Sequence, residues 1–373
     1  MARGCYEEPM ATLRHTRWLL VLVNLAACNK WDEEEVGGLR HLSQTGTGPY
    51  HGTEGIDLPI HSNENRLLLT VQADPFRSVI SKLESPKGDA WVSDTTDVRS
   101  STNAGFVNNV SVLNWPVLDS DTPLSTGSWR ATVGVVGEDL TFQEGDFQID
   151  AWIGNDTNDS GGEVEVVFHF AEGLDQDPTF RAALDTAVTT WEEIYGSVGL
   201  TLVIEDVVLD GSPPGLPGVS DPDVWRQVSA DNLGRVDIVF REIIEEVPQA
   251  YGLAGGIPGA IGSTANSGIL VSAALAAGTD GVFSTEETRI LAETLAHETG
   301  HYLGLFHPVE IGWDRWDAID DTDECDNEAF CAEALDDNLM FPYPVCALNH
   351  CIPQTVITDQ QGRTAQRWTG LHD

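Results

Sequence analysis

Basic residues are scarce in this sequence. Its 373 residues include 19 lysines and arginines against 60 aspartates and glutamates, which gives a formal net charge of −41. Nucleic acids and acidic membrane surfaces are bound through clustered Lys and Arg side chains. The composition therefore excludes a nucleic-acid partner and a polybasic membrane contact. It favours a solvated acidic surface, with calcium binding by carboxylate oxygens as the functional alternative.

Cysteine is missing from the whole stretch between Cys28 and Cys325. Four of the six cysteines crowd instead into a short C-terminal segment, at Cys325, Cys331, Cys346 and Cys351. An even set of cysteines in an exported chain predicts two disulfides, and the sequence leaves all three pairings open. The alternative is a structural zinc site, although the first two of these cysteines do not have the usual short spacing.

The apolar run near the N-terminus is short. Trp18–Ala27 follows a basic start and cannot comfortably cross a bilayer, which is typical of a signal peptide over residues 1–28. The run ends in Leu-Ala-Ala-Cys, which resembles the lipobox of bacterial lipoproteins. The resemblance implies that Cys28 carries a lipid anchor, the chain's only membrane attachment, and that Asn29 directs it to the outer membrane. An ordinary cleaved signal peptide, which would give a secreted protein, is the alternative.

Changes in composition divide the rest of the chain. Residues 29–60 mix charges, glycine and polar residues with little periodicity, which predicts a flexible tether. Short apolar runs separated by turns predict an all-β sandwich over 61–154. Residues 155–162 contain no apolar residue and predict a linker before a second domain over 163–373. The expected strands of the sandwich are 66–73, 78–83, 106–117, 129–136 and 147–153.

In the second domain strands and helices alternate, so the predicted fold class is α+β. Asp177 and Pro178 supply an N-cap and a first-turn proline for one long helix. Ser284 and Glu287 form a capping box that opens another helix, which runs to about Leu303. The expected strands of this domain are 164–170, 200–208, 236–244 and 268–275.

The string HETGHYLGLFH, from His297 to His307, begins on the second of these helices and continues past its end. His297 and His301 are four residues apart, so both rings leave one helix face and two ring nitrogens can meet one zinc ion. Gly304 tolerates the left-handed conformation that ends a helix, and His307 then approaches from another direction. Three neutral ligands leave a fourth position open, as a catalytic zinc site needs. Glu298 is placed to act as general base and acid for metal-activated water.

This pattern resembles the H-E-x-x-H-x-x-G-x-x-H signature of the metzincin zinc peptidases. The resemblance implies a catalytic domain with a twisted mixed sheet, two long helices and a C-terminal subdomain with a methionine turn beneath the metal. Met340 is the candidate for that turn, because the other two methionines lie in the leader. Tyr343 would assist the transition state, as a tyrosine after this turn does in some relatives, or would simply pack. The missing cysteines exclude a cysteine-switch propeptide.

The segment DAIDDTDEC, from Asp317 to Cys325, resembles the pappalysin branch of that family, with Asp323 in place of a proline. Pappalysin-like enzymes bind calcium near this region. The resemblance therefore implies calcium candidates at Asp317, Asp320 and Asp321, with a solvated acidic loop as the alternative.

Two further segments fit the same resemblance. Residues 250–256 precede the edge strand that, in metzincins, pairs with the backbone of a bound peptide. Thr358 and Gln361 form a capping box where the pappalysin C-terminal helix begins. The sequence thus predicts a zinc-dependent endopeptidase with protein or peptide substrates. The alternatives are a surface-binding lipoprotein with a non-proteolytic zinc domain, and a hydrolase of cell-wall amides.

Overall fold

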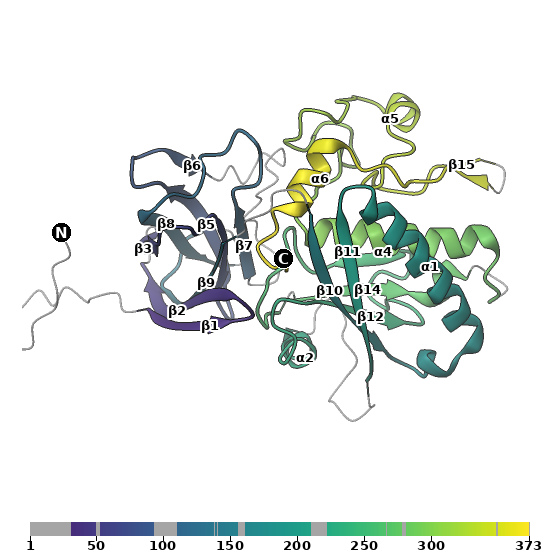
Figure 1. The fold of residues 1–373 in the computed structure, drawn as a ribbon, viewed down its shortest axis with the longest axis horizontal. Coiled ribbons are helices and arrows are strands. Elements are labelled where there is room, and N and C mark those ends of the chain that lie inside the picture. Colours follow the sequence, from purple (N-terminus) through teal and green to yellow (C-terminus); the bar gives the residue numbers. More distant parts are fainter. Residues whose placement is uncertain are drawn as a thin grey trace, which may run out of the picture.

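The fold is mixed α+β, with a β-rich half before residue 155 and an α/β half after it (Figure 1). The computed structural model describes residues 31–372 apart from 50–52, 93–109, 138, 140, 156–160, 210–221, 266, 278–280 and 348–349. The expected signal peptide with Cys28 and most of the expected linker lie outside the described residues. Among the described helices, none is both long and apolar enough to cross a membrane.

Two antiparallel sheets form the first half. One has the strand order β1-β2-β9-β4-β7 and the other β3-β8-β5-β6. Their buried side chains, such as Leu69, Trp129 and Ile149, form one apolar core. The strands are β1 (Asp32–Val36), β2 (Leu39–Gly48), β3 (Glu54–Ile60), β4 (Arg66–Gln72), β5 (Arg77–Glu84), β6 (Ala90–Val92), β7 (Val110–Trp115), β8 (Gly127–Val136) and β9 (Gly145–Gly154).

The expectation of a flexible tether over residues 29–60 is wrong. Three strands, β1 to β3, lie in this range, and β2 pairs with β9 from Arg40 to Gly48. Leu42, Ile56 and Leu58 point into the core and are at most 1% exposed. Polar residues between them face outward, so the apolar residues alternate as in a half-buried strand. The sandwich therefore begins near residue 31 rather than at residue 61.

A five-stranded sheet with the order β11-β10-β12-β14-β13 forms the second half. All neighbouring strands are parallel except β13, which lies antiparallel to β14 at one edge. The expected strand over 268–275 ends early, because the Ser272 hydroxyl accepts a hydrogen bond from the Leu275 amide and caps a short helix. The strands are β10 (Gly162–Phe170), β11 (Leu200–Val208), β12 (Val236–Arg241), β13 (Gly252–Ala254) and β14 (Ile269–Ser272).

Two long helices, α1 (Pro178–Gly196) and α4 (Thr285–Tyr302), share one core with alternate residues of this sheet. Phe168 of β10 stacks on Trp191 of α1 with the ring centroids 6.2 Å apart. The Tyr195 hydroxyl of α1 donates to the Ala296 carbonyl of α4 at 2.8 Å. The position of α4 is therefore fixed by both apolar packing and a buried hydrogen bond. The other helices are η1 (Leu174–Gln176), α2 (Pro222–Val228), α3 (Ala273–Ala276), α5 (Glu328–Ala334) and α6 (Asp359–Gln366).

The C-terminal end of the chain returns to the sandwich (Figure 1). The Asn114 side-chain amide donates to the Arg367 carbonyl at 2.8 Å, and its oxygen accepts from the Thr369 amide at 3.0 Å. Asp119 binds the guanidinium groups of Arg363 and Arg367. Residues of the sandwich also join the core of the second half: Leu68, Val110, Val112 and Trp152.

Two disulfides close short loops of the C-terminal part. Cys325 pairs with Cys331, and Cys346 pairs with Cys351 across the hairpin of β15 (Cys346–Ala347) and β16 (His350–Cys351). The structure therefore selects the local pairing among the three possible ones. None of these four cysteines remains free for a structural zinc site.

Candidate metal centre

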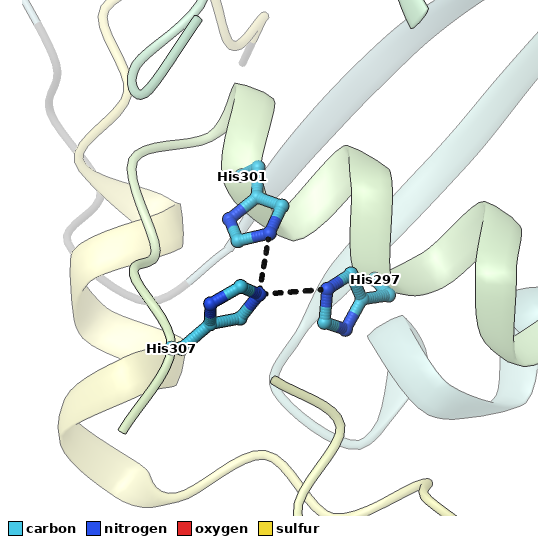
Figure 2. Close-up of side chains that lie close together, drawn as sticks. All are labelled: His297, His301 and His307. Atoms are coloured by element: carbon cyan, nitrogen blue, oxygen red, sulfur yellow. Dashed lines mark hydrogen bonds between the residues drawn. The ribbon is translucent and has the colours of Figure 1, made fainter. Parts of the chain in front are cut away.

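Helix α4 positions the first half of the site. The Ser284 hydroxyl accepts from the Glu287 amide, and the Glu287 carboxylate accepts from the Ser284 amide, so the predicted capping box is confirmed. One turn apart near the other end of the helix, His297 and His301 project from the same face (Figure 2).

Gly304 directs the chain away from the helix. Its φ of +103° is a conformation that side chains with a Cβ rarely adopt, and its amide donates to the His301 carbonyl at 2.9 Å. The Leu305 amide then donates to the Gly300 carbonyl at 2.9 Å. This turn brings His307, on a segment without regular structure, back toward the two helix histidines (Figure 2).

The three rings converge through their Nε2 atoms. Nε2 of His307 lies 3.2 Å from Nε2 of His301 and 3.3 Å from Nε2 of His297. Nitrogens bound at about 2.0–2.1 Å to one tetrahedral ion are about 3.3 Å apart, so the observed spacing fits zinc. Among the described residues, this is the group of His, Cys, Asp and Glu side chains with ligand atoms close enough to share a metal ion.

The opposite nitrogens of the rings are all bound to acceptors. Nδ1 of His297 donates to the Leu339 carbonyl at 2.8 Å, and Nδ1 of His301 donates to the Leu305 carbonyl at 2.7 Å. Nδ1 of His307 contacts a Glu310 carboxylate oxygen at 3.1 Å. Because these partners only accept, each ring carries its proton on Nδ1 and turns an Nε2 lone pair to the centre. Three lone pairs that face one another repel, and a cation between them removes that repulsion.

Burial keeps the helix histidines neutral. It lowers the pKa of His297 to about 3. Burial also lowers the pKa of His301 well below its usual value. For Glu310, burial raises the pKa, but the hydrogen bond from His307 and the charge of Arg315 act against it, and the pKa is lowered overall. The centre therefore presents the two neutral imidazoles of the helix beside an ionised carboxylate, as a divalent cation requires.

Glu298 lies on the same helix, between His297 and the sheet edge. Its side chain is 8% exposed, and burial raises its pKa to about 8, opposed by a hydrogen bond from the Ala254 amide. Gly252 of β13 leaves room for it, since a Cβ at this position would lie 2.5 Å from Glu298 Cγ. The absence of a side chain at Gly252 thus lets the carboxyl group sit between α4 and β13.

The residue expected in the methionine turn lies directly beneath the helix. Met340 is fully buried, and a Cβ at Gly300 would lie 2.5 Å from its sulfur atom. The turn is held by Asn338, whose side-chain oxygen accepts from the Met340 amide at 2.9 Å. Because the adjacent Leu339 carbonyl is the acceptor for His297, this segment both supports the helix and orients one of its rings.

A cavity of about 300 Å³ opens beside His297 and Glu298. It lies between residues 249–252, α4 and the segment from 339 to 344. Glu293 lines it and accepts hydrogen bonds from Arg289 and from the Gln354 amide. A bound molecule in this cavity would therefore lie next to the three-histidine centre.

Tyr343 lines this cavity, but its hydroxyl donates to Glu328 at 3.3 Å. Its ring packs against Phe341 and Trp313, with centroids 5.0 Å and 6.1 Å away. Of the two roles considered for this residue, the observed contacts are those of packing.

The calcium candidates are not gathered as the histidines are. Asp321 accepts from the Thr358 hydroxyl and the Gln360 amide, and Asp317 accepts from the Ile319 amide. The ligand atoms of Asp317, Asp320 and Asp321 do not form a cluster with metal-binding spacing in the described part of the chain. The contacts of Asp321 instead tie this loop to the start of α6, where the expected capping box of Thr358 and Gln361 is present.

Sequence reasoning missed the supports of the histidines. The acceptors at Leu339 and Leu305 are backbone carbonyls, which leave no residue signature. Glu310, three residues after His307, is visible in the sequence, and its spacing from the third histidine was the available signal.

Comparisons with known proteins give remote likenesses. No protein-family profile and no curated protein matches the sequence. Metalloproteinase-II from Bacteroides fragilis aligns with a TM-score of 0.32 and 14% identity, over 57% of this chain and 55% of its own. Two structures of a family two carbohydrate esterase from Clostridium thermocellum, one an active-site mutant, align with a TM-score of 0.16 and 8% identity. Each covers 53% of this chain, and 61% and 62% of the esterase chains. This chain therefore spans just over half of the length of the structures it resembles.

Proposed function

We propose that this chain is a zinc-dependent endopeptidase of the metzincin type, most similar to the pappalysin branch. The observation that carries the proposal is the convergence of three Nε2 atoms, 3.2–3.3 Å from one another around His307, beside a buried glutamate. The Nδ1–H of each ring donates a hydrogen bond to a carbonyl or carboxylate oxygen, which is the usual arrangement of metal-binding histidines.

His297, His301 and His307 would hold the zinc ion. Their donor set is three neutral nitrogens, and a fourth position remains for water or substrate, which is typical of catalytic zinc sites. A zinc ion in this position would supply a Lewis acid that lowers the pKa of water and polarises a carbonyl group.

Glu298 would move the protons of the reaction. Its carboxyl group lines the cavity beside His297, and burial raises its pKa to about 8. A carboxyl group whose pKa lies closer to the working pH than usual can both accept and release a proton. It would accept a proton from the attacking water and return it to the nitrogen of the leaving amine, so that the peptide bond is hydrolysed without net change in the side chain.

An extended peptide would bind along the sheet edge. In the described sheet, β13 pairs with β14 on one side and is the last strand, so its other side can add a strand. Backbone hydrogen bonds of this kind would fix the substrate with little dependence on its sequence. The neighbouring cavity would bind one side chain of the substrate and so determine which residues are preferred at the cleavage site.

The location of the protein is part of the proposal. Two disulfides support an exported chain, since such bonds persist in oxidising compartments. A lipid anchor at Cys28, with the outer membrane as its destination, rests on the lipobox resemblance alone.

Digestion of a peptide library, followed by mass spectrometry with and without a chelator, tests the activity. We expect internal cleavage that stops on chelation and returns with zinc. Replacing Glu298→Ala should leave one bound zinc per chain and reduce hydrolysis by about 100- to 10,000-fold, because only the proton transfer is lost. Glu192→Gln, a change at an exposed position of α1, is the matched control and should behave as the wild type.

The other two functions are outcomes of the same experiment. Release of fragments from peptidoglycan but not from casein or library peptides would favour the hydrolase of cell-wall amides. Zinc binding with no hydrolysis of either substrate would favour a surface-binding protein and contradict the proposal.

A further inference from the structure

The three histidines differ in the group that holds their Nδ1 atom. His297 and His301 donate to main-chain carbonyls, whose positions follow from the backbone. His307 instead contacts the Glu310 carboxylate at 3.1 Å. The third ring is therefore the one whose orientation depends on a side chain.

His307 also lacks the support of a helix. It lies three residues beyond Gly304, where the chain has no regular structure, and its side chain is 20% exposed. A ring on such a segment can rotate about its side-chain bonds unless its second nitrogen is held.

Glu310 is itself fixed by a tight hairpin. Its amide donates to the Arg315 carbonyl at 2.9 Å, and its carbonyl accepts from the Trp313 amide at 3.0 Å. Trp313 stacks on Phe341, next to Met340 beneath the histidines, with ring centroids 6.4 Å apart. The hairpin is thus fastened to the same turn that orients His297.

We propose that Glu310 is a positioning residue that holds the His307 ring in its ligand orientation and strengthens metal binding at the three-histidine centre. The inference rests on the proposed function only in requiring that this centre binds a metal. A carboxylate that accepts from Nδ1 keeps the proton on that nitrogen and leaves the Nε2 lone pair for the ion. The negative charge of the carboxylate also makes Nε2 a stronger ligand for the metal ion. A main-chain carbonyl has this effect to a smaller extent.

Zinc affinity, measured on the full chain by competition with a chromogenic chelator, tests this role. Glu310→Ala should lower the affinity by about 10- to 100-fold, because both the acceptor and the charge are lost. Glu310→Gln keeps an acceptor oxygen and should recover part of that loss. With cobalt(II) as probe, the alanine variant should show an altered visible absorption spectrum, which a merely structural change elsewhere would not produce.

Asp314→Asn is the matched control. Asp314 lies in the same hairpin, its side chain is 76% exposed, and its partner is Arg315 at 3.7 Å rather than a histidine. This variant removes the same charge and should leave the zinc affinity unchanged. Thermal unfolding of the metal-free proteins shows whether each variant is folded. If Glu310→Ala does not fold, the zinc affinity of Glu310→Gln tests the inference instead, because glutamine is nearly the same size as glutamate.

Two results would overturn the inference alone: a wild-type affinity in folded Glu310→Ala, or an equal loss in Glu310→Gln and Asp314→Asn. A wild-type chain that binds no zinc would overturn the proposed function as well, so the two failures are distinguishable.

Discussion

His297, Glu298 and His301 share one helix, whereas His307 lies beyond Gly304 on a segment without regular structure. The helix half of the centre is built from residues within one turn of each other. The turn half is held by the hairpin around Glu310, whose Trp313 stacks on Phe341. The comparison shows that spacing along a helix determines the positions of two histidines, whereas the position of the third depends on tertiary contacts.

Removing the support beneath the helix half should have the largest effect on stability. Met340→Ala should lower the free energy of unfolding by about 2–5 kcal/mol, because a cavity opens under Gly300 in a fully buried place. Met340→Leu, of similar volume, should cost less than about 1.5 kcal/mol. Urea unfolding of both variants measures the difference. Equal stability of the two would show that the turn does not carry the helix.

Changing Gly304, which joins the helix half of the metal centre to its turn half, should have an intermediate effect. Gly304→Ala places a Cβ on a residue with φ of +103°, which should cost about 1–3 kcal/mol and shift His307 away from its partners. Gly281→Ala is the control, since its φ of +68° is also positive but it lies before α4, away from the site. Both variants should lose thermal stability, and Gly304→Ala alone should lose zinc affinity. Unchanged zinc affinity in Gly304→Ala would contradict this role.

A contact away from the metal centre, between the sandwich and the C-terminal end of the chain, should have the smallest effect. Asp119 binds Arg367 and Arg363, and the hydrogen bond from Arg367 lowers the pKa of its carboxyl group. The charged form is therefore favoured in the folded state. Its contribution is present above the ordinary carboxyl pKa and is lost as the pH falls through the lowered value.

Asp119→Asn should therefore cost well under 1 kcal/mol near neutral pH, since the side chain is 55% exposed and solvent screens the pair. The difference from the wild type should shrink with added salt and vanish in strong acid. Thermal unfolding across pH and salt checks this, and a large, salt-independent loss would argue against a screened surface pair.

The sequence was sufficient where the determinants are local. The capping boxes at Ser284 and Thr358 and the N-cap at Asp177 are present, since each depends on side chains within three residues of the helix start. The spacing of His297 and His301 likewise requires only a regular helix. These features follow from backbone geometry that neighbouring residues determine.

The features that sequence reasoning missed depend on contacts between distant residues or are hidden by composition. The charged run DEEEV of β1 obscured the alternation in β2 and β3, although Ile56, Leu58 and Ile60 are spaced as in a strand. The local disulfide pairing was one of three equal options until the fold brought Cys325 to Cys331. The acidic loop at Asp321 resembled a cation site, yet two of its contacts are capping interactions with the start of α6.

Trp152 belongs to β9 of the sandwich, but its indole is buried in the core of the other half with Ile261 nearby in the same cluster. The polar segment at 155–162 therefore separates the halves along the chain without separating their interiors. A fragment that starts at residue 163 would present the surface that now covers Trp152, Leu68 and Val112 to water as an apolar patch. Such a fragment should associate or aggregate on expression, because the sandwich would no longer cover this face.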